Sequence, residues 1–107
     1  MKYIKQYEKT QFSKYQIDDY VLLKPYMDNI SHLYQIYNNW GHIIGSSLGQ
    51  VDRILTHMYD VDFIDSTSFE VKNIKSNYVL EPDILRELTK KEIEEFKMMS
   101  EVNKYNL

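Results

Sequence analysis

The sequence contains neither cysteine nor alanine, and it has only three glycines and two prolines among 107 residues. Without cysteine there is no disulfide framework, thiolate metal site or cysteine nucleophile. No apolar run approaches the roughly 18 residues that a membrane-spanning helix needs, and the N-terminus lacks an apolar stretch of signal-peptide length. No linker rich in glycine, proline or serine divides the chain. We therefore expect one cytoplasmic domain over residues 1–107.

Strand-forming residues are abundant instead. Isoleucine, asparagine, lysine and tyrosine account for 39 of the 107 residues, and lysine outnumbers arginine 11 to 2. Isoleucine and tyrosine favour strands, and 43% apolar residues are enough for a single core. The four enriched residue types all have AT-rich codons, so the bias points to a low-GC phage, virus or bacterium.

Charge is unevenly distributed along a chain whose net charge is −3. Residues 1–14 form a basic arm of net charge +3, with four lysines against Glu8 alone: Lys2, Lys5, Lys9 and Lys14. This basic N-terminal segment, residues 1–14, either contacts phosphate or an acidic partner, or is a solvated lead-in segment. The acidic balance of the whole chain does not favour general binding to a nucleic-acid duplex.

Alternating apolar residues predict strands in two places. Tyr20-Val21-Leu22-Leu23 is a short apolar run that Lys24-Pro25 stops. Residues 59–63 alternate strictly, with Tyr59, Val61 and Phe63 on one face. A turn at residues 65–68 and renewed alternation at 69–72 then predict a β-hairpin over residues 58–72.

The segments between these anchors give weaker signals. Residues 41–45 are expected to form a central strand framed by glycines, which residues 34–37 either extend or precede as a separate element. Residues 51–55 fit a helical turn or a strand, and residues 25–33 are expected to form a loop. Pro82 suits the first position of a short turn over residues 82–86.

A capping box predicts the C-terminal helix. The Thr89 side chain can accept a hydrogen bond from the amide of Glu92, whose carboxylate can reach back to the amide of Thr89. Leu88 and Ile93 stand at the positions of a hydrophobic staple. An apolar face continues through Phe96 and Met99 or Val102, so we expect a helix from about residue 90 to 101.

The order of these pieces resembles small SH3-like β-barrel proteins of phages and large viruses. The resemblance is carried by the segments DYVLL, GHII, YDVDF with FEV, and YVL, and by the ending LTKKEIEEF. It implies a mainly β (α+β) fold, an antiparallel barrel over residues 15–80 followed by a helical segment at 81–107. Such barrels bind peptides, proteins or nucleic acids, and the fold alone does not choose among these. Residues 25–57 exceed a simple barrel loop, which makes them the place to look for a special function.

No catalytic or metal site emerges from the polar residues. The three histidines, His32, His42 and His57, are too far apart in sequence for a recognisable zinc motif, and we interpret them as structural. Residues 45–49 match the nucleophile-elbow pattern around Ser47, but that elbow belongs to a much larger α/β sheet. We expect a flexible loop there, and neither enzymatic activity nor a cofactor or metal.

Acidic and aromatic residues are the candidates for binding. Asp60 and Asp62 share one strand face, either as a carboxylate pair or as the solvent side of an amphipathic strand. Tyrosine and tryptophan are favoured at interfaces, although Trp40 equally suits a core. The candidate interaction residues are Tyr26, Tyr34, Tyr37, Trp40, Asp60 and Asp62.

These observations predict a protein-interaction module with aromatic residues at the centre of its contact surface. The rim would be acidic and made by Asp18, Asp19, Asp60 and Asp62. An acidic face of this kind would cover a basic nucleic-acid-binding surface on a partner and so inhibit a host defence complex. One alternative is a nucleic-acid-binding barrel that uses the lysines of residues 1–14 together with stacking tyrosines. Another is a structural virion or assembly component.

Overall fold

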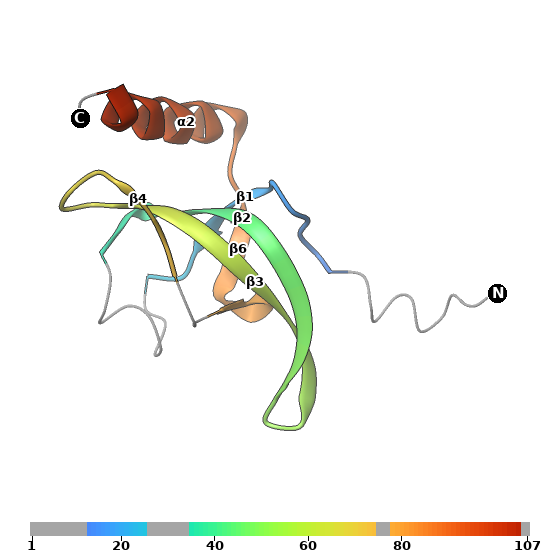
Figure 1. Cartoon of the computed structure of the whole chain (residues 1–107). Helices are drawn as coiled ribbons and strands as arrows, with labels where there is room; N and C mark the ends of the chain where they lie inside the picture. The colour runs from blue at the N-terminus through green and yellow to red at the C-terminus, as the bar shows by residue number, and fades with distance from the viewer. Residues whose placement is uncertain (1–12, 26–34, 75–77, 106–107) are drawn as a thin grey trace.

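The computed structural model describes residues 13–25, 35–74 and 78–105, which form one antiparallel sheet and a C-terminal helix (Figure 1). The elements are β1 (Tyr20–Leu23), β2 (Ile36–Val51), β3 (Ile54–Asp65), β4 (Val71–Asn73), β5 (Val79–Leu80), the 3₁₀ helix η1 (Glu81–Asp83), β6 (Ile84–Glu87) and α2 (Lys90–Tyr105). The mainly β architecture with a C-terminal helix is therefore as predicted.

The sheet has the order β4-β3-β2-β1-β6, and β5 pairs with β3 off this path. Among the described residues, the first strand, β1, thus pairs directly with the last, β6, with Val21 opposite Glu87. Within the described ranges, β4 and β6 at the two ends of the path do not pair with each other. The strands consequently form an open sheet, and a closed barrel is not seen.

Two irregularities bend the long β2–β3 hairpin. The register shifts between Ile36 and Gly41 and again between Ile43 and Gly45. Asn38 and Asn39, within the first shift, have positive φ angles of 52° and 59°, a region that asparagine tolerates better than most residues. Bulges increase the local twist of a strand, which accounts for the curvature of β2 and β3 in Figure 1.

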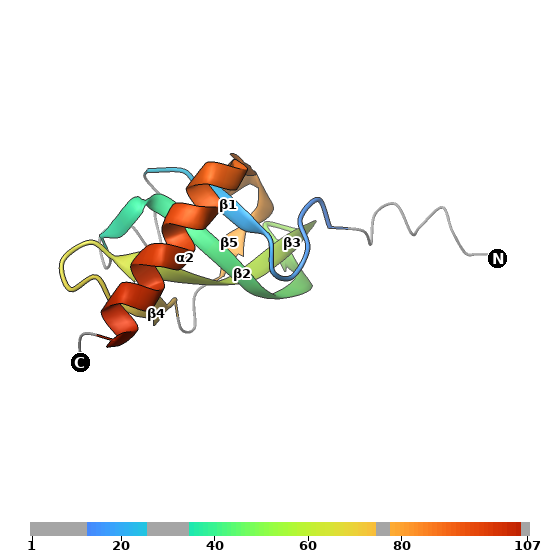
Figure 2. The ribbon, with the colours of Figure 1, turned by 90° about the horizontal axis from the view of Figure 1, so that it is seen from above.

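Apolar residues pack on both faces of the sheet. Tyr59, Val61 and Phe63 are completely buried on one face, as their alternation predicts. They belong to the first core, which comprises Tyr15, Val21, Leu23, Ile43, Tyr59, Val61, Phe63, Ile74, Val79 and Ile84. The second core comprises Trp40, Ile64, Leu88 and Phe96, with Tyr20, Leu22, Tyr37, Ile93 and Met99 packed against it. It fills the space between the sheet and α2, which lies across the strands in Figure 2.

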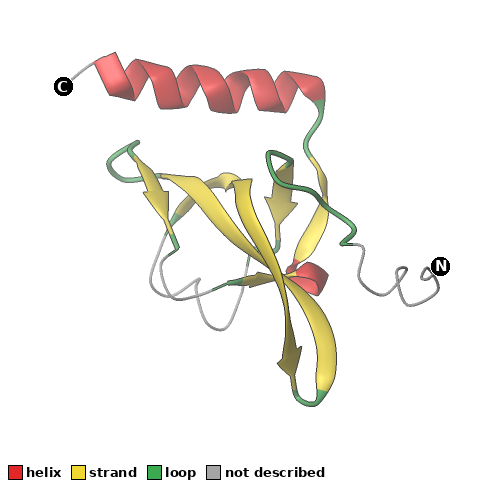
Figure 3. Cartoon of the chain, turned by 45° about the vertical axis from the view of Figure 1, so that its right-hand side comes forward, coloured by secondary structure: helices red, strands yellow, loops and turns green. Residues whose placement is uncertain are grey.

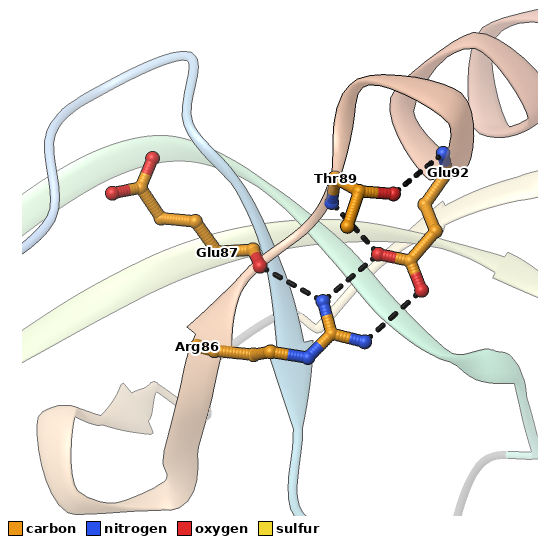
Figure 4. Close-up of polar contacts among 4 residues, drawn as sticks. All are labelled: Arg86, Glu87, Thr89 and Glu92. Atoms are coloured by element: carbon orange, nitrogen blue, oxygen red, sulfur yellow. Dashed lines mark hydrogen bonds and ion pairs between the residues drawn. The ribbon is translucent and has the colours of Figure 1, made fainter.

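The predicted capping box is present at the start of α2 (Figure 4). The amide of Thr89 donates to Oε1 of Glu92 at 2.7 Å, and the amide of Glu92 donates to Oγ1 of Thr89 at 3.2 Å. Arg86 adds a two-pronged contact, donating from both guanidinium Nη atoms to the Glu92 carboxylate at 2.9 and 3.0 Å. These hydrogen bonds, from Arg86 first and then from Thr89, lower the pKa of Glu92 to about 2. The helix begins at Lys90 as expected and extends to Tyr105.

A buried tyrosine fastens the segment that precedes β1. The Tyr59 hydroxyl donates to Oε2 of Glu81 at 2.5 Å, and the amide of Lys14 donates to the same oxygen at 3.0 Å. The amide of Tyr15 donates to the Tyr59 hydroxyl at 3.4 Å. Burial, and then the hydrogen bond to Glu81, raise the pKa of Tyr59 to about 12. Residues 13–15 are thus held against β3 and η1.

Three sequence-based expectations are corrected. Residues 45–49, expected as a flexible loop, lie inside β2, because their backbone pairs with residues 56–60 of β3. Residues 51–55 are neither a helical turn nor one strand, since a two-residue turn at Asp52 and Arg53 separates β2 from β3. Residues 84–87, placed in a helical segment, form β6, whose pairing with β1 is a long-range contact.

Candidate interaction surface

The β2–β3 hairpin extends beyond the rest of the sheet as a two-stranded ribbon. From Leu48 to His57, among the described residues, its two strands pair only with each other; we call residues 48–57 the arm. Its tip is the turn at Asp52 and Arg53, whose φ angles of 52° and 69° are those of a type I′ turn. Figure 3 shows the arm pointing away from α2.

Aliphatic side chains of the arm are open to solvent. Leu48 is 43% exposed, Ile54 65% and Leu55 61%. None of the three belongs to either core. Because Leu48 pairs with His57 and Gln50 pairs with Leu55, the alternation of the strands places both leucines on one face of the ribbon and Ile54 on the other. The arm therefore adds little to the packing of this chain and offers apolar contact area on both faces.

Two carboxylates lie at the root of the arm. Asp60 stands opposite Gly45, and Nδ2 of Asn73 donates to Oδ1 of Asp60 at 2.9 Å and to Oδ1 of Asp62 at 2.8 Å. Both aspartates are half-buried, on the strand face opposite the first core. One carboxamide thus holds the two acids close together; we call Asp60, Asp62 and Asn73 the acidic root. Among the described residues, no three histidine, aspartate or glutamate side chains are grouped to hold a metal ion.

The acidic root continues into a row of side chains across four strands. The register aligns Tyr20 with His42, His42 with Asp62, and Asp62 with Asn73. The rings of Tyr20 and His42 are stacked, with centroids 4.3 Å apart and planes 5° from parallel. Nε2 of His42 lies 3.3 Å from Oδ1 of Asp18. Burial, and then the negative charge of Asp18, raise the pKa of Tyr20. The row borders α2 and presents hydrogen-bonding groups next to the acidic root.

The aromatic candidates lie elsewhere on the same face of the sheet. Trp40 is 6% exposed and belongs to the second core beneath α2, where it offers little area to a partner. Tyr37 meets Trp40 and Phe69 edge-on at centroid distances of 5.8 and 5.9 Å, and its hydroxyl donates to Oε2 of Glu95 at 3.3 Å. Tyr26 and Tyr34 lie outside the described residues. The structure thus brings Tyr37 to Trp40 and Asp60 to Asp62.

Sequence reasoning did not single out Leu48, Ile54 and Leu55. The turn at Asp52 and Arg53 would have revealed the hairpin that exposes these residues. It was not recognised, because Asp52-Arg53 lacks the Asn-Gly or Asp-Gly pair typical of a two-residue hairpin turn. Of the other residues considered, Ser46 and Ser47 lie in β2. His32 and the lysines at positions 2, 5 and 9 lie outside the described residues. Lys14 is described, with its Nζ atom 5.7 Å from the centre of the Tyr15 ring.

Comparisons with protein-family models, with curated proteins and with solved structures gave no match to this chain. In the described part of the chain, no helix has the length and apolar character needed to cross a membrane.

Proposed function

We propose that this chain is a non-enzymatic protein-interaction module that contacts its partner through the arm and the acidic root. The observation that carries the proposal is the exposure of Leu48, Ile54 and Leu55 on a ribbon that contributes to neither core. Isolated two-stranded hairpins are marginally stable in water, so an extended arm with exposed aliphatic residues gains most when a partner covers it.

The chemistry of the surface indicates the chemistry of the partner. An apolar ribbon fits an apolar cleft, and the carboxylates of Asp60 and Asp62 at its root fit a basic rim beside that cleft. A basic rim is a common property of proteins that bind nucleic acid. We therefore favour an inhibitor of a nucleic-acid-handling or host defence complex, encoded by a phage or virus, and the AT-rich codon bias supports such an origin.

We also propose a relationship to small SH3-like barrels. The pairing of β1 with β6 supports it, and so does the short link from β5 through η1 to β6, because together they carry the chain around the first core. Barrels of this type commonly serve as binding modules, which agrees with the proposed function.

Affinity purification of the tagged protein from its host, with and without nuclease, tests the interaction. We expect a stoichiometric protein partner that survives nuclease and is lost with the double variant Ile54→Ser, Leu55→Ser. Leu85→Ser is the matched control, since Leu85 is 51% exposed on β6, away from the arm. If the double arm variant still captures the partner, the arm is not the contact site. If nuclease treatment abolishes recovery of the partner, nucleic-acid binding is favoured instead.

The acidic root has its own test. Asp60→Asn with Asp62→Asn removes both charges while keeping the size of the side chains. Binding to the identified partner should weaken and lose most of its dependence on salt, because charges at the rim of an interface act through screened electrostatics. Unchanged binding and an unchanged salt dependence would show that the two carboxylates do not face the partner.

A further inference from the structure

One edge of β2 has no neighbouring strand among the described residues along much of its length. Pairing with β1 ends at His42, and the last backbone contact on that side joins Ile43 to Asp18 and Asp19. From Ile44 to Val51, no strand in the described parts of the chain pairs with this side of β2. We call residues 44–51 the free edge.

The hairpin turn determines which backbone groups point outward from the free edge. In the two-residue turn the C=O of Val51 accepts from the N–H of Ile54, and hydrogen-bonded pairs then alternate along an antiparallel ribbon. Val51, Gly49 and Ser47 therefore direct their N–H and C=O groups toward β3. The residues between them direct theirs away from it: Ser46, Leu48 and Gln50.

The free edge lacks the features that normally prevent strand pairing. Natural proteins protect an exposed edge with charged residues, proline or short strand length. The segment IGSSLGQV is eight residues long and contains no charged residue and no proline. The strands at the ends of the sheet path are protected: β4 has three residues and carries Lys72, and β6 carries Arg86 and Glu87. An unprotected edge is suited to pairing with a further strand.

We propose that the free edge pairs antiparallel with the same edge of a second copy of this chain. The two copies would form a symmetric dimer with a continuous ribbon of four strands, two from each copy. Antiparallel pairing of a strand with itself satisfies a two-fold axis, as closed dimers require. With the axis at Leu48, this residue faces Leu48 of the partner subunit, and Ser46 faces Gln50 of the partner subunit.

The side chains favour a second copy over a foreign strand. Although each chain carries a net charge of −3, the free edge carries none, so pairing brings no like charges face to face. Leu48 and Leu55 lie on one face of the arm, and the two-fold axis would join both pairs of leucines into one cluster. Lateral pairing uses backbone groups and leaves the opposite face, with Ile54, open to another partner. The dimer shares Leu48 and Leu55 with the proposed interaction surface, but oligomeric state and partner capture are measured separately.

Sedimentation and light scattering of the purified full chain test the dimer. We expect a particle of twice the chain mass of 12.9 kDa, dissociating on dilution. Leu48→Lys places two like charges across the axis and should raise the dimer dissociation constant by about tenfold or more. Ile54→Lys is the matched control, because it replaces another exposed aliphatic residue of the arm, 65% exposed against 43% for Leu48, but leaves the free edge intact.

Circular dichroism verifies that both variants remain folded. A wild-type chain that stays monomeric at millimolar concentration contradicts the proposed dimer. Loss of the dimer with Ile54→Lys but not with Leu48→Lys contradicts the free edge as its interface. Either result leaves the heterologous interaction standing, since that is measured by partner capture. Conversely, a dimer whose arm captures no partner would refute the proposed function alone.

The absence of cysteine permits a direct test of register. Oxidation of Leu48→Cys should give a covalent dimer, because directly opposed strand residues have Cα atoms within the distance that a disulfide spans. Ile54→Cys, on β3 and therefore on the outer strand of the four-stranded ribbon, should remain monomeric under the same conditions. Equal cross-linking of both variants, or none with Leu48→Cys, would contradict an axis at Leu48.

Discussion

Replacing Gly41 with alanine tests how tightly the first core closes around β2. A Cβ atom at Gly41 would lie 2.5 Å from Cγ1 of Val61 and 3.3 Å from Cδ1 of Leu23. Val61 is 0% and Leu23 is 1% exposed, so neither side chain has room to move away. Overpacking of this kind costs about 1–3 kcal/mol, while the smaller conformational entropy of the unfolded alanine chain offsets about 0.4–1 kcal/mol. We expect Gly41→Ala to lower the free energy of unfolding by about 1–2 kcal/mol.

A second substitution identifies the clash as the cause. Val61→Ala removes the obstructing Cγ1 atom and by itself should cost about 2 kcal/mol through lost burial and a cavity. In the double variant the new methyl group at position 41 occupies part of that cavity. The combined loss should therefore be smaller than the sum of the single losses by at least about 1 kcal/mol.

Urea denaturation measures all four corners of this cycle. The single tryptophan, Trp40, reports on the second core by fluorescence, and circular dichroism reports on the sheet. Coincident transitions would show that unfolding is two-state, which the comparison of free energies requires. A neutral or stabilising Gly41→Ala, or single losses that add within about 0.5 kcal/mol, would refute the packing argument.

Three further predictions concern the arm, the helix cap and the buried tyrosine. Arg53→Gly should raise the free energy of unfolding by about 0.5–1 kcal/mol, because Arg53 has a left-handed φ of 69°; a lower urea midpoint would contradict the type I′ turn. Because the pKa of Glu92 falls to about 2 in the folded state, its contribution to stability is complete above its ordinary pKa and is lost as the pH falls through about 2. An Arg86→Met variant should flatten that acid transition, and an NMR titration of Glu92 at its ordinary pKa would exclude the cap. Tyr59→Phe should cost about 1–3 kcal/mol and speed proteolysis near residues 13–15; unchanged proteolysis would show that the hydroxyl does not fasten this segment.

Sequence analysis predicted the elements whose structure is determined by residues close together in the sequence. The alternation of Tyr59, Val61 and Phe63 corresponds to complete burial of all three, and the hairpin that follows pairs Phe63 with Lys72. The capping box predicted the start of α2 at Lys90, because both of its hydrogen bonds lie within one turn. Patterns of this kind carry their physical cause within a few residues.

The features that sequence analysis missed depend on distant partners. β6 has only Ile84 buried among its four residues, so its sequence shows no alternation of apolar and polar residues. It is a strand because it pairs with β1. The glycines and serines of residues 45–49 resemble a loop and become a strand because β3 provides a ladder beside them. The burial of Trp40 depends on the docking of α2, which periodicity alone does not reveal.

The pairing of β1 with β6 imposes an order on folding. The β2–β3 hairpin closes through a two-residue turn, and local hairpins form within microseconds. β1 has its inner neighbour as soon as β2 exists, but its outer neighbour β6 lies near the end of the described chain. Pairings between segments far apart in sequence are slow because the intervening loop must be ordered first. During synthesis the outer side of β1 therefore stays uncovered until residues 84–87 have left the ribosome, and the capped helix, which follows β6 directly, docks only after them.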